Sequence, residues 1–84
     1  MSETAEVHNF TLSIIVANRA GALSRVTGLF SRRGYNIDTL TVSPMVEDPT
    51  NSRIIMTSSG DDATRTQIIK QLDKLFDVKE VKLI

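Results

Sequence analysis

The sequence predicts an α+β fold of the order strand–helix–strand–strand–helix–strand, the ferredoxin-like split βαβ arrangement. Alternating apolar and polar residues mark four short segments as strands, and two other segments repeat their apolar residues at helical spacing. The length of 84 residues suits one small domain. We therefore expect a polar tail at residues 1–7 and a single domain at residues 8–84. This domain should be a four-stranded antiparallel sheet with both helices on one face.

The first strand and the first helix are expected on either side of the segment 18–21. Residues 10–16 alternate apolar side chains with Thr11 and Ser13, which is typical of a half-buried strand. Gly34 can end the following helix in the left-handed conformation. The helix itself is predicted by apolar residues at helical spacing, which are Leu23, Val26, Leu29 and Phe30.

The second strand, over residues 35–44, contains a change of phase. Its apolar residues move from the odd position of Ile37 to the even positions of Leu40 and Val42, which predicts a bulge near Asp38. A third strand is expected over residues 53–58, after a turn-forming segment.

The second helix is expected to begin at Asp61 or Asp62, because aspartate caps helix N-termini well. A last strand alternates Val81 and Leu83 with charged residues. The apolar stripe that we predict for the second helix contains Ile68, Ile69, Leu72, Leu75 and Phe76.

Several classes of function are disfavoured by composition. Ten basic and ten acidic residues give a net charge of zero, which argues against a nucleic-acid partner held by charge. The chain has no cysteine and one histidine, so neither a C-x-x-C metal site nor a nucleophile–base pair is evident. The third strand also lacks the aromatic residues that RNA-binding sheets use for base stacking. With no apolar leader or membrane span in the sequence, we expect a non-enzymatic, cytoplasmic domain without cofactor or metal.

The segment between the first strand and the first helix is the candidate site. Unpaired N–H groups at a helix N-terminus attract carboxylates, and Gly21 allows close approach to the backbone. The amide oxygens of Asn18 and Asn36 could receive an ammonium group. These two residues lie at opposite ends of the helix, so they could share a ligand only across a two-fold dimer. The residues alone leave a second interpretation open, in which the glycines and Asn36 serve only as caps and turns.

The motifs GALSRV, GLFSRRGYNI and LTV, followed by EDP and SRI, occur in order. In this order they resemble the small, regulatory subunit of acetolactate synthase (acetohydroxyacid synthase), whose domain is an ACT domain. The resemblance covers essentially the whole chain after the tail, although many family members continue into a second domain. It implies a homodimer that binds a branched-chain amino acid, typically valine, between protomers. It also implies a separate catalytic subunit that carries thiamine diphosphate, Mg²⁺ and FAD.

Carried over to matching positions, the resemblance implies a site shared by two protomers, although Ala20 stands where the family often has proline. The expected function is feedback inhibition and activation of the catalytic subunit in branched-chain amino-acid biosynthesis. The alternative is a ligand-free ACT-fold module for dimerisation or docking. The implied ligand residues are Asn18, Ala20, Gly21, Ala22 and Leu23 of one protomer with Asn36 and Ile37 of the other.

Overall fold

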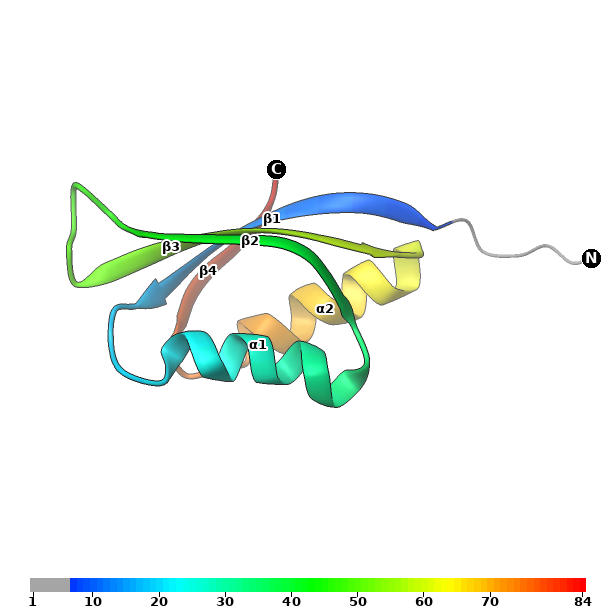
Figure 1. Ribbon diagram of the computed structural model, residues 1–84, viewed down its shortest axis with the longest axis horizontal. Coiled ribbons are helices and arrows are strands. Elements are labelled where there is room, and N and C mark those ends of the chain that lie inside the picture. Colours follow the sequence, from blue (N-terminus) through cyan, green and yellow to red (C-terminus); the bar gives the residue numbers. More distant parts are fainter. Residues whose placement is uncertain (1–6) are drawn as a thin grey trace, which may run out of the picture.

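The computed structural model describes residues 7–84 and confirms the predicted order of elements. The strands form one antiparallel sheet in the order β2-β3-β1-β4, and both helices lie against one of its faces (Figure 1). Residues 1–6 of the expected tail lie outside the described residues. The elements are β1 (His8–Ala17), α1 (Ala22–Arg33), β2 (Asn36–Pro44), β3 (Asn51–Gly60), α2 (Asp62–Asp73) and β4 (Val78–Leu83).

The predicted bulge in β2 is confirmed at Asp38. In the register with β3, Ile37 pairs with Ser58 and Thr39 pairs with Thr57, so Asp38 is passed over. The extra residue reverses the alternation of side chains along the strand. Because of this reversal, the apolar residues on both sides of the bulge face the helices.

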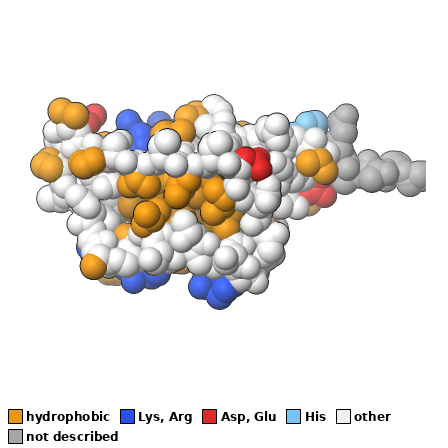
Figure 2. Space-filling model, viewed as in Figure 1, with side chains coloured by type: hydrophobic (Ala, Val, Ile, Leu, Met, Phe, Trp, Pro, Cys, Tyr) orange, Lys and Arg blue, Asp and Glu red, His pale blue; other side chains and the backbone are white. Residues whose placement is uncertain are grey.

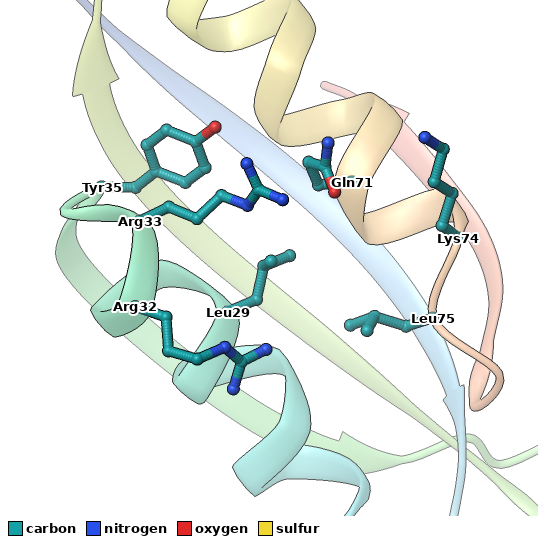
Figure 3. A pocket seen from close by; sticks show the side chains of 7 residues that line it. All are labelled: Leu29, Arg32, Arg33, Tyr35, Gln71, Lys74 and Leu75. Carbon is teal, nitrogen blue, oxygen red and sulfur yellow. The ribbon is translucent and has the colours of Figure 1, made fainter.

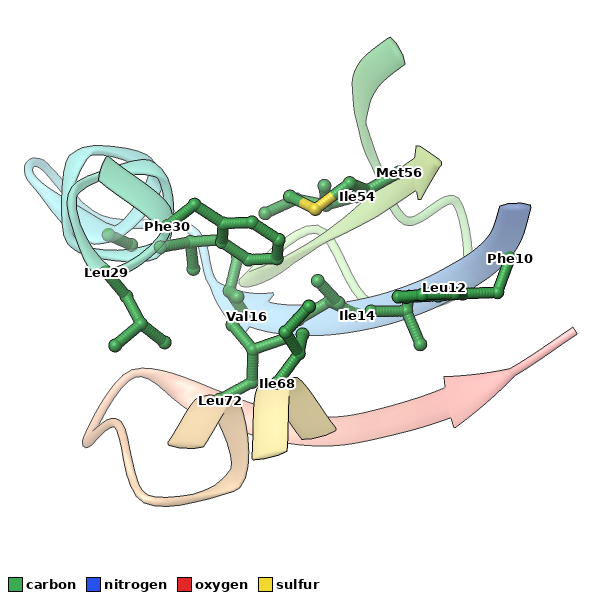
Figure 4. Close-up of a cluster of buried hydrophobic side chains, with 12 residues drawn as sticks. Phe10, Leu12, Ile14, Val16, Leu29, Phe30, Ile54, Met56, Ile68 and Leu72 are labelled. Carbon is green, nitrogen blue, oxygen red and sulfur yellow. The ribbon is translucent and has the colours of Figure 1, made fainter. Parts of the chain in front are cut away.

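The core lies between the sheet and the two helices (Figure 4). Phe30 reaches from α1 toward the sheet, and its ring meets that of Tyr35 edge-on with centroids 5.9 Å apart. Removal of this apolar surface from water is the main stabilising contribution to so small a fold. The buried cluster consists of Phe10, Leu12, Ile14, Val16, Ala22, Val26, Leu29, Phe30, Ile54, Met56, Ile68 and Leu72.

Helix α1 has a glycine in the left-handed conformation at each end. Gly21 precedes it with φ of 86°, and Gly34 follows it with φ of 70°. At the C-terminal end the Gly34 N–H donates to the Ser31 carbonyl, and the Tyr35 N–H donates to the Phe30 carbonyl. The predicted left-handed cap at Gly34 is therefore confirmed.

Helix α2 begins as predicted but ends earlier than the apolar stripe suggested. The Asp61 carboxylate accepts the Thr64 N–H at 2.7 Å, which confirms Asp61 as the N-cap. The helix ends at Asp73, and tight hydrogen bonds turn the chain at residues 74–75. Leu75 still packs against the core, but Phe76 is 84% exposed. Assigning Phe76 to the buried stripe was therefore wrong, because the turn directs it to solvent.

Candidate functional site

The loop between β1 and α1 is anchored to two other turns of the molecule. The Ala17 N–H donates to the carbonyl of Asp77, in the turn between α2 and β4, at 2.8 Å. The Asn18 N–H donates to the carbonyl of Thr50, in the turn between β2 and β3, also at 2.8 Å. Three turns that are distant in sequence therefore meet where α1 begins.

The N-terminus of α1 presents unpaired donors. Among the described residues, no side chain caps this end of the helix. The backbone N–H groups of Gly21, Leu23 and Ser24 donate to no acceptor within residues 7–84. The Ala22 N–H donates to the Arg19 carbonyl at 3.2 Å, so this donor is not available to a ligand. The three unpaired groups, at the positive end of the helix dipole, can receive a carboxylate.

A cavity of about 200 Å³ lies beside this helix terminus. At roughly 30 Å³ per water molecule, it could hold about seven waters, which is the size of a small amino acid rather than a nucleotide. Asn18, Arg19 and Ser52 contribute polar groups to its lining. Its other lining residues are apolar or small, and they are Val16, Ala17, Ala22, Leu23, Val42 and Ile54.

Each of the two asparagines of the predicted site donates a hydrogen bond from its side-chain amide nitrogen to a neighbouring oxygen. Asn18 Nδ2 donates to the Pro49 carbonyl at 3.2 Å, and Asn36 Nδ2 donates to Asp38 Oδ1 at 2.6 Å. Among residues 7–84 neither amide oxygen receives a hydrogen bond, so both can accept a donor from a ligand. They lie at opposite ends of the 12-residue helix α1. At 1.5 Å per residue these ends are about 18 Å apart.

A buried carboxylate lies behind the loop. Asp77 is 1% exposed, and its Oδ2 accepts a hydrogen bond from Nε of Arg25. This bond holds the pKa of Asp77 below its ordinary value, against the opposing effect of burial, and raises the pKa of Arg25. The added Cβ of any larger residue at position 21 would lie 2.8 Å from Nη1 of Arg25. Asp77 therefore holds the guanidinium of Arg25 next to Gly21, the residue that precedes α1.

A larger cavity, of about 550 Å³, lies between α1 and α2 on the helical side of the molecule (Figure 3). Leu29 and Leu75 form its floor, and the basic side chains of Arg32, Arg33 and Lys74 surround it. Cations in the last turn of α1 are favoured by the helix dipole, which accounts for Arg32 and Arg33 without a ligand. It contains none of the residues predicted for the site, so the smaller cavity is the candidate.

Comparison with known families decides the membership of the chain. Residues 12–80 match the family model described as the AHAS small subunit-like ACT domain. This match runs from Leu12 in β1 to Glu80 in β4, and it includes the loop and the cavity described above. The chain belongs to this family.

Relatives of this ACT domain include small subunits of acetolactate synthase. The acetolactate synthase isozyme 3 small subunit of Escherichia coli is 56% identical over 70 residues, which are 83% of this chain and 42% of the relative. A probable acetolactate synthase small subunit of Archaeoglobus fulgidus is 45% identical over 88% of this chain and 46% of its own. The chain thus spans less than half the length of these two relatives.

A solved structure shows the same ACT fold. The acetolactate synthase small subunit of Thermotoga maritima superposes with a TM-score of 0.84 and 39% identity, over 90% of this chain and 47% of that one. The ACT domain of a GTP pyrophosphokinase from Chlorobium tepidum superposes with a TM-score of 0.76 at 16% identity, which supports the fold alone.

The predicted site residues of the ACT domain fall into three groups. Asn18, Ala22 and Leu23 line the smaller cavity, while Ala20 and Gly21 lie in the loop beside it. Asn36 and Ile37 lie at the far end of α1, so one protomer does not bring all seven together.

Sequence reasoning missed Arg19 and Val42 in the cavity lining and Asp77 behind the loop. The position of Arg19 inside the loop could have indicated its role. Asp77 and Arg25 are 52 positions apart, and nothing in the sequence pattern pairs them.

Neither helix of residues 7–84 has the length and apolarity that a membrane span needs. The same range contains no group of three or more acidic or histidine side chains placed to hold a metal ion.

Proposed function

We propose that this chain is a regulatory subunit of acetolactate synthase that binds a branched-chain amino acid, with valine as the first candidate. Ligand binding would inhibit a separate catalytic subunit carrying thiamine diphosphate, Mg²⁺ and FAD, and the unliganded form would support its activity in the cytoplasm. The observation that carries the proposal is the 200 Å³ cavity beside unpaired N–H groups, in a chain of the small-subunit family.

Valine matches the chemistry of this cavity at three points. Its carboxylate would accept the N–H groups of Gly21, Leu23 and Ser24 at the positive end of α1. Its ammonium group would donate to an amide oxygen of Asn18, or of Asn36 from a second protomer. Its isopropyl group would lie on the apolar wall formed mainly by residues of β1, α1 and β2.

A second protomer is part of the proposal, because about 18 Å separates the ends of α1 in one chain. A two-fold axis that pairs α1 and β2 with their copies would bring the Asn36 end of one protomer to the Asn18 end of the other. Strand β2 is an edge of the sheet, and apolar side chains gather between it and α1 (Figure 2). Leu23 and Val42, from these two elements, are 39% and 44% exposed.

Feedback inhibition would follow from thermodynamic linkage. Valine can inhibit only if it binds one arrangement of the dimer more tightly than another, and if the catalytic subunit distinguishes the two. The alternative function is an ACT-fold module that dimerises or docks with an empty site.

Calorimetric titration with valine, leucine and isoleucine separates these two functions. We expect saturable heat with valine and weaker binding of a ligand one methylene larger, since that difference changes affinity by about 1–3 kcal/mol in an apolar pocket. Valine at 100 times its Kd should also stabilise the fold by ~2.7 kcal/mol, which thermal unfolding would detect. A folded chain with no binding heat at millimolar valine would support the empty module instead.

A further inference from the structure

We propose that Arg19 is a further ligand-binding residue of this cavity and that it links the bound amino acid to the exposed ring of Phe76. The proposal rests on the proposed function, because the ligand is the same amino acid. It adds a residue outside the predicted site and a route from the cavity to the molecular surface.

Arg19 contacts three features at once. It lines the cavity, and its guanidinium carbon lies 5.3 Å from the centroid of the Phe76 ring. Its Nε lies 3.5 Å from Oδ1 of Asp77. The side chain is 53% exposed, so it has room to change its rotamer.

Asp77 accepts a hydrogen bond from Arg25 but has only a longer ionic contact with Arg19. Arg25 donates a hydrogen bond to Oδ2, whereas Oδ1 is buried and has no hydrogen-bond partner among residues 7–84. Arg19 therefore stands 3.5 Å from Oδ1 without a hydrogen bond that fixes it there. Two guanidinium groups face one carboxylate, which leaves an excess of positive charge beside the opening of α1.

A carboxylate that binds at the N-terminus of α1 supplies the second anion for this cluster. Arg19 can then turn toward the ligand, because charge-assisted hydrogen bonds are stronger than the contact of an exposed cation with a phenyl ring. That rotation withdraws the guanidinium from Phe76.

Phe76 is well placed to report the change. It is 84% exposed, and it lies in the turn whose next residue, Asp77, binds the loop through its backbone carbonyl. Occupancy of the cavity thus alters the surroundings of an aromatic side chain on the surface of the domain.

The sequence contains no tryptophan, so Phe76→Trp introduces a single tryptophan at the end of this route, and its emission can be followed apart from that of Tyr35. We expect valine to change the emission of Trp at position 76 saturably, with the Kd that calorimetry gives for the same variant. Ile84→Trp is the matched control, because Ile84 is also exposed but follows the far end of β4. Its emission should not change with valine.

Arg19→Gln in the Phe76→Trp background tests the link itself. We expect valine to bind at least several-fold more weakly, and the emission to stay constant even at saturation. Arg19→Lys keeps the positive charge and should restore part of the affinity. Circular dichroism of each variant checks the fold, which should persist because Arg19 is largely exposed.

The outcomes distinguish the two proposals. If the chain without these substitutions gives no heat with valine, the proposed function and the link fail together. If it binds valine while Trp at position 76 stays silent, or if Arg19→Gln binds valine with unchanged affinity, only the role of Arg19 is overturned.

Discussion

The two left-handed glycines of α1 have the same backbone requirement but different surroundings. A Cβ at Gly34 meets nothing within 4 Å, whereas one at Gly21 meets the guanidinium of Arg25. We expect Gly34→Ala to destabilise the fold by ~1 kcal/mol, the cost of a side chain at positive φ. Gly21→Ala should cost more, because it also displaces Arg25 from Asp77. Urea unfolding of the two variants measures the difference, and equal losses would mean that Arg25 moves aside freely.

Gly21→Asp adds a charge to this effect. Its carboxylate would lie where the ligand carboxylate is proposed to bind, so like charges would meet and the free N–H groups would find an internal acceptor. We expect a less stable but folded domain that no longer binds valine, as judged by circular dichroism and calorimetry. Because Gly21 has positive φ, some loss of stability accompanies the loss of binding. Unchanged valine affinity in a folded variant would place the ligand elsewhere.

Asp77 makes stability depend on pH. Its pKa in the folded state is lowered, mainly by the hydrogen bond from Arg25, below the value of about 3.9 expected in the unfolded chain. A lowered pKa stabilises the fold above the unfolded value, and that contribution disappears as the pH falls through the folded value. We expect Asp77→Asn to be less stable at pH 7, and the gap from the parent chain to close below about pH 4. Unfolding curves from pH 7 to pH 3 measure this gap, and a constant gap would contradict the role of the charge.

At single positions, the sequence was most informative where backbone geometry limits which residue type can occupy the position. The local sequence predicted Gly34 as a C-terminal cap and either Asp61 or Asp62 as an N-cap, and the structure confirms Gly34 and selects Asp61. Gly21, which was expected to let a ligand approach the backbone, has the positive φ that glycine adopts without steric cost. Asp77 could not be predicted, because its partner Arg25 is brought to it only by the packing of α1 beside the turn that follows α2.

At the scale of the elements, the end of α2 offers a direct test of whether Phe76 belongs to the apolar stripe of that helix. Leu72 is fully buried, whereas Phe76 lies outside the helix and is 84% exposed. Leu72→Ala should destabilise the fold by about 2–5 kcal/mol, and Phe76→Ala should stay within ~0.5 kcal/mol. Thermal and urea unfolding give both values. A large loss of stability for Phe76→Ala would mean that Phe76 packs against the core after all.

The start of α2 offers a matched pair of aspartates. Asp61 caps the helix by accepting the Thr64 N–H, while its neighbour Asp62 makes only an exposed ion pair with Arg65 at 3.6 Å. We expect Asp61→Ala to lower the Tm by several degrees and Asp62→Ala to change it little. Equal effects of the two substitutions would mean that nonspecific interaction with the helix dipole outweighs the cap.

The elements show where periodicity succeeds and where it fails. The bulge at Asp38 was predictable, because a strand whose apolar residues change phase needs one extra residue to keep both halves facing the core. The end of α2 was not, since Leu75 continues the helical spacing although it packs against the core from a turn. An apolar residue in the turn can therefore keep the helical spacing of apolar residues in the sequence although the helix has already ended.

For the whole molecule, a site shared between protomers predicts complementation. Asn18→Ala and Asn36→Ala should each abolish or strongly weaken valine binding as homodimers. In a refolded equimolar mixture, half of the dimers would be mixed, and each mixed dimer would have one intact site. Calorimetry should therefore recover about a quarter of the sites at the original affinity. No recovery, together with a monomer in sedimentation at micromolar concentration, would rule out the shared site.

The double anchoring of the loop also bears on the order in which the protein is made. When residues 7–60 have left the ribosome, the cavity-lining residues Val16, Val42 and Ile54 are already available. Asp77, whose carbonyl accepts the Ala17 N–H, is not. Strand β1, which borders the loop, also pairs with β4, the last of the four strands of this sheet in chain order. If the domain binds an amino acid as proposed, a nascent chain should therefore gain that affinity only after β4 has left the exit tunnel. Under the proposed function, a newly made chain would respond to an amino acid only once this four-stranded sheet is complete.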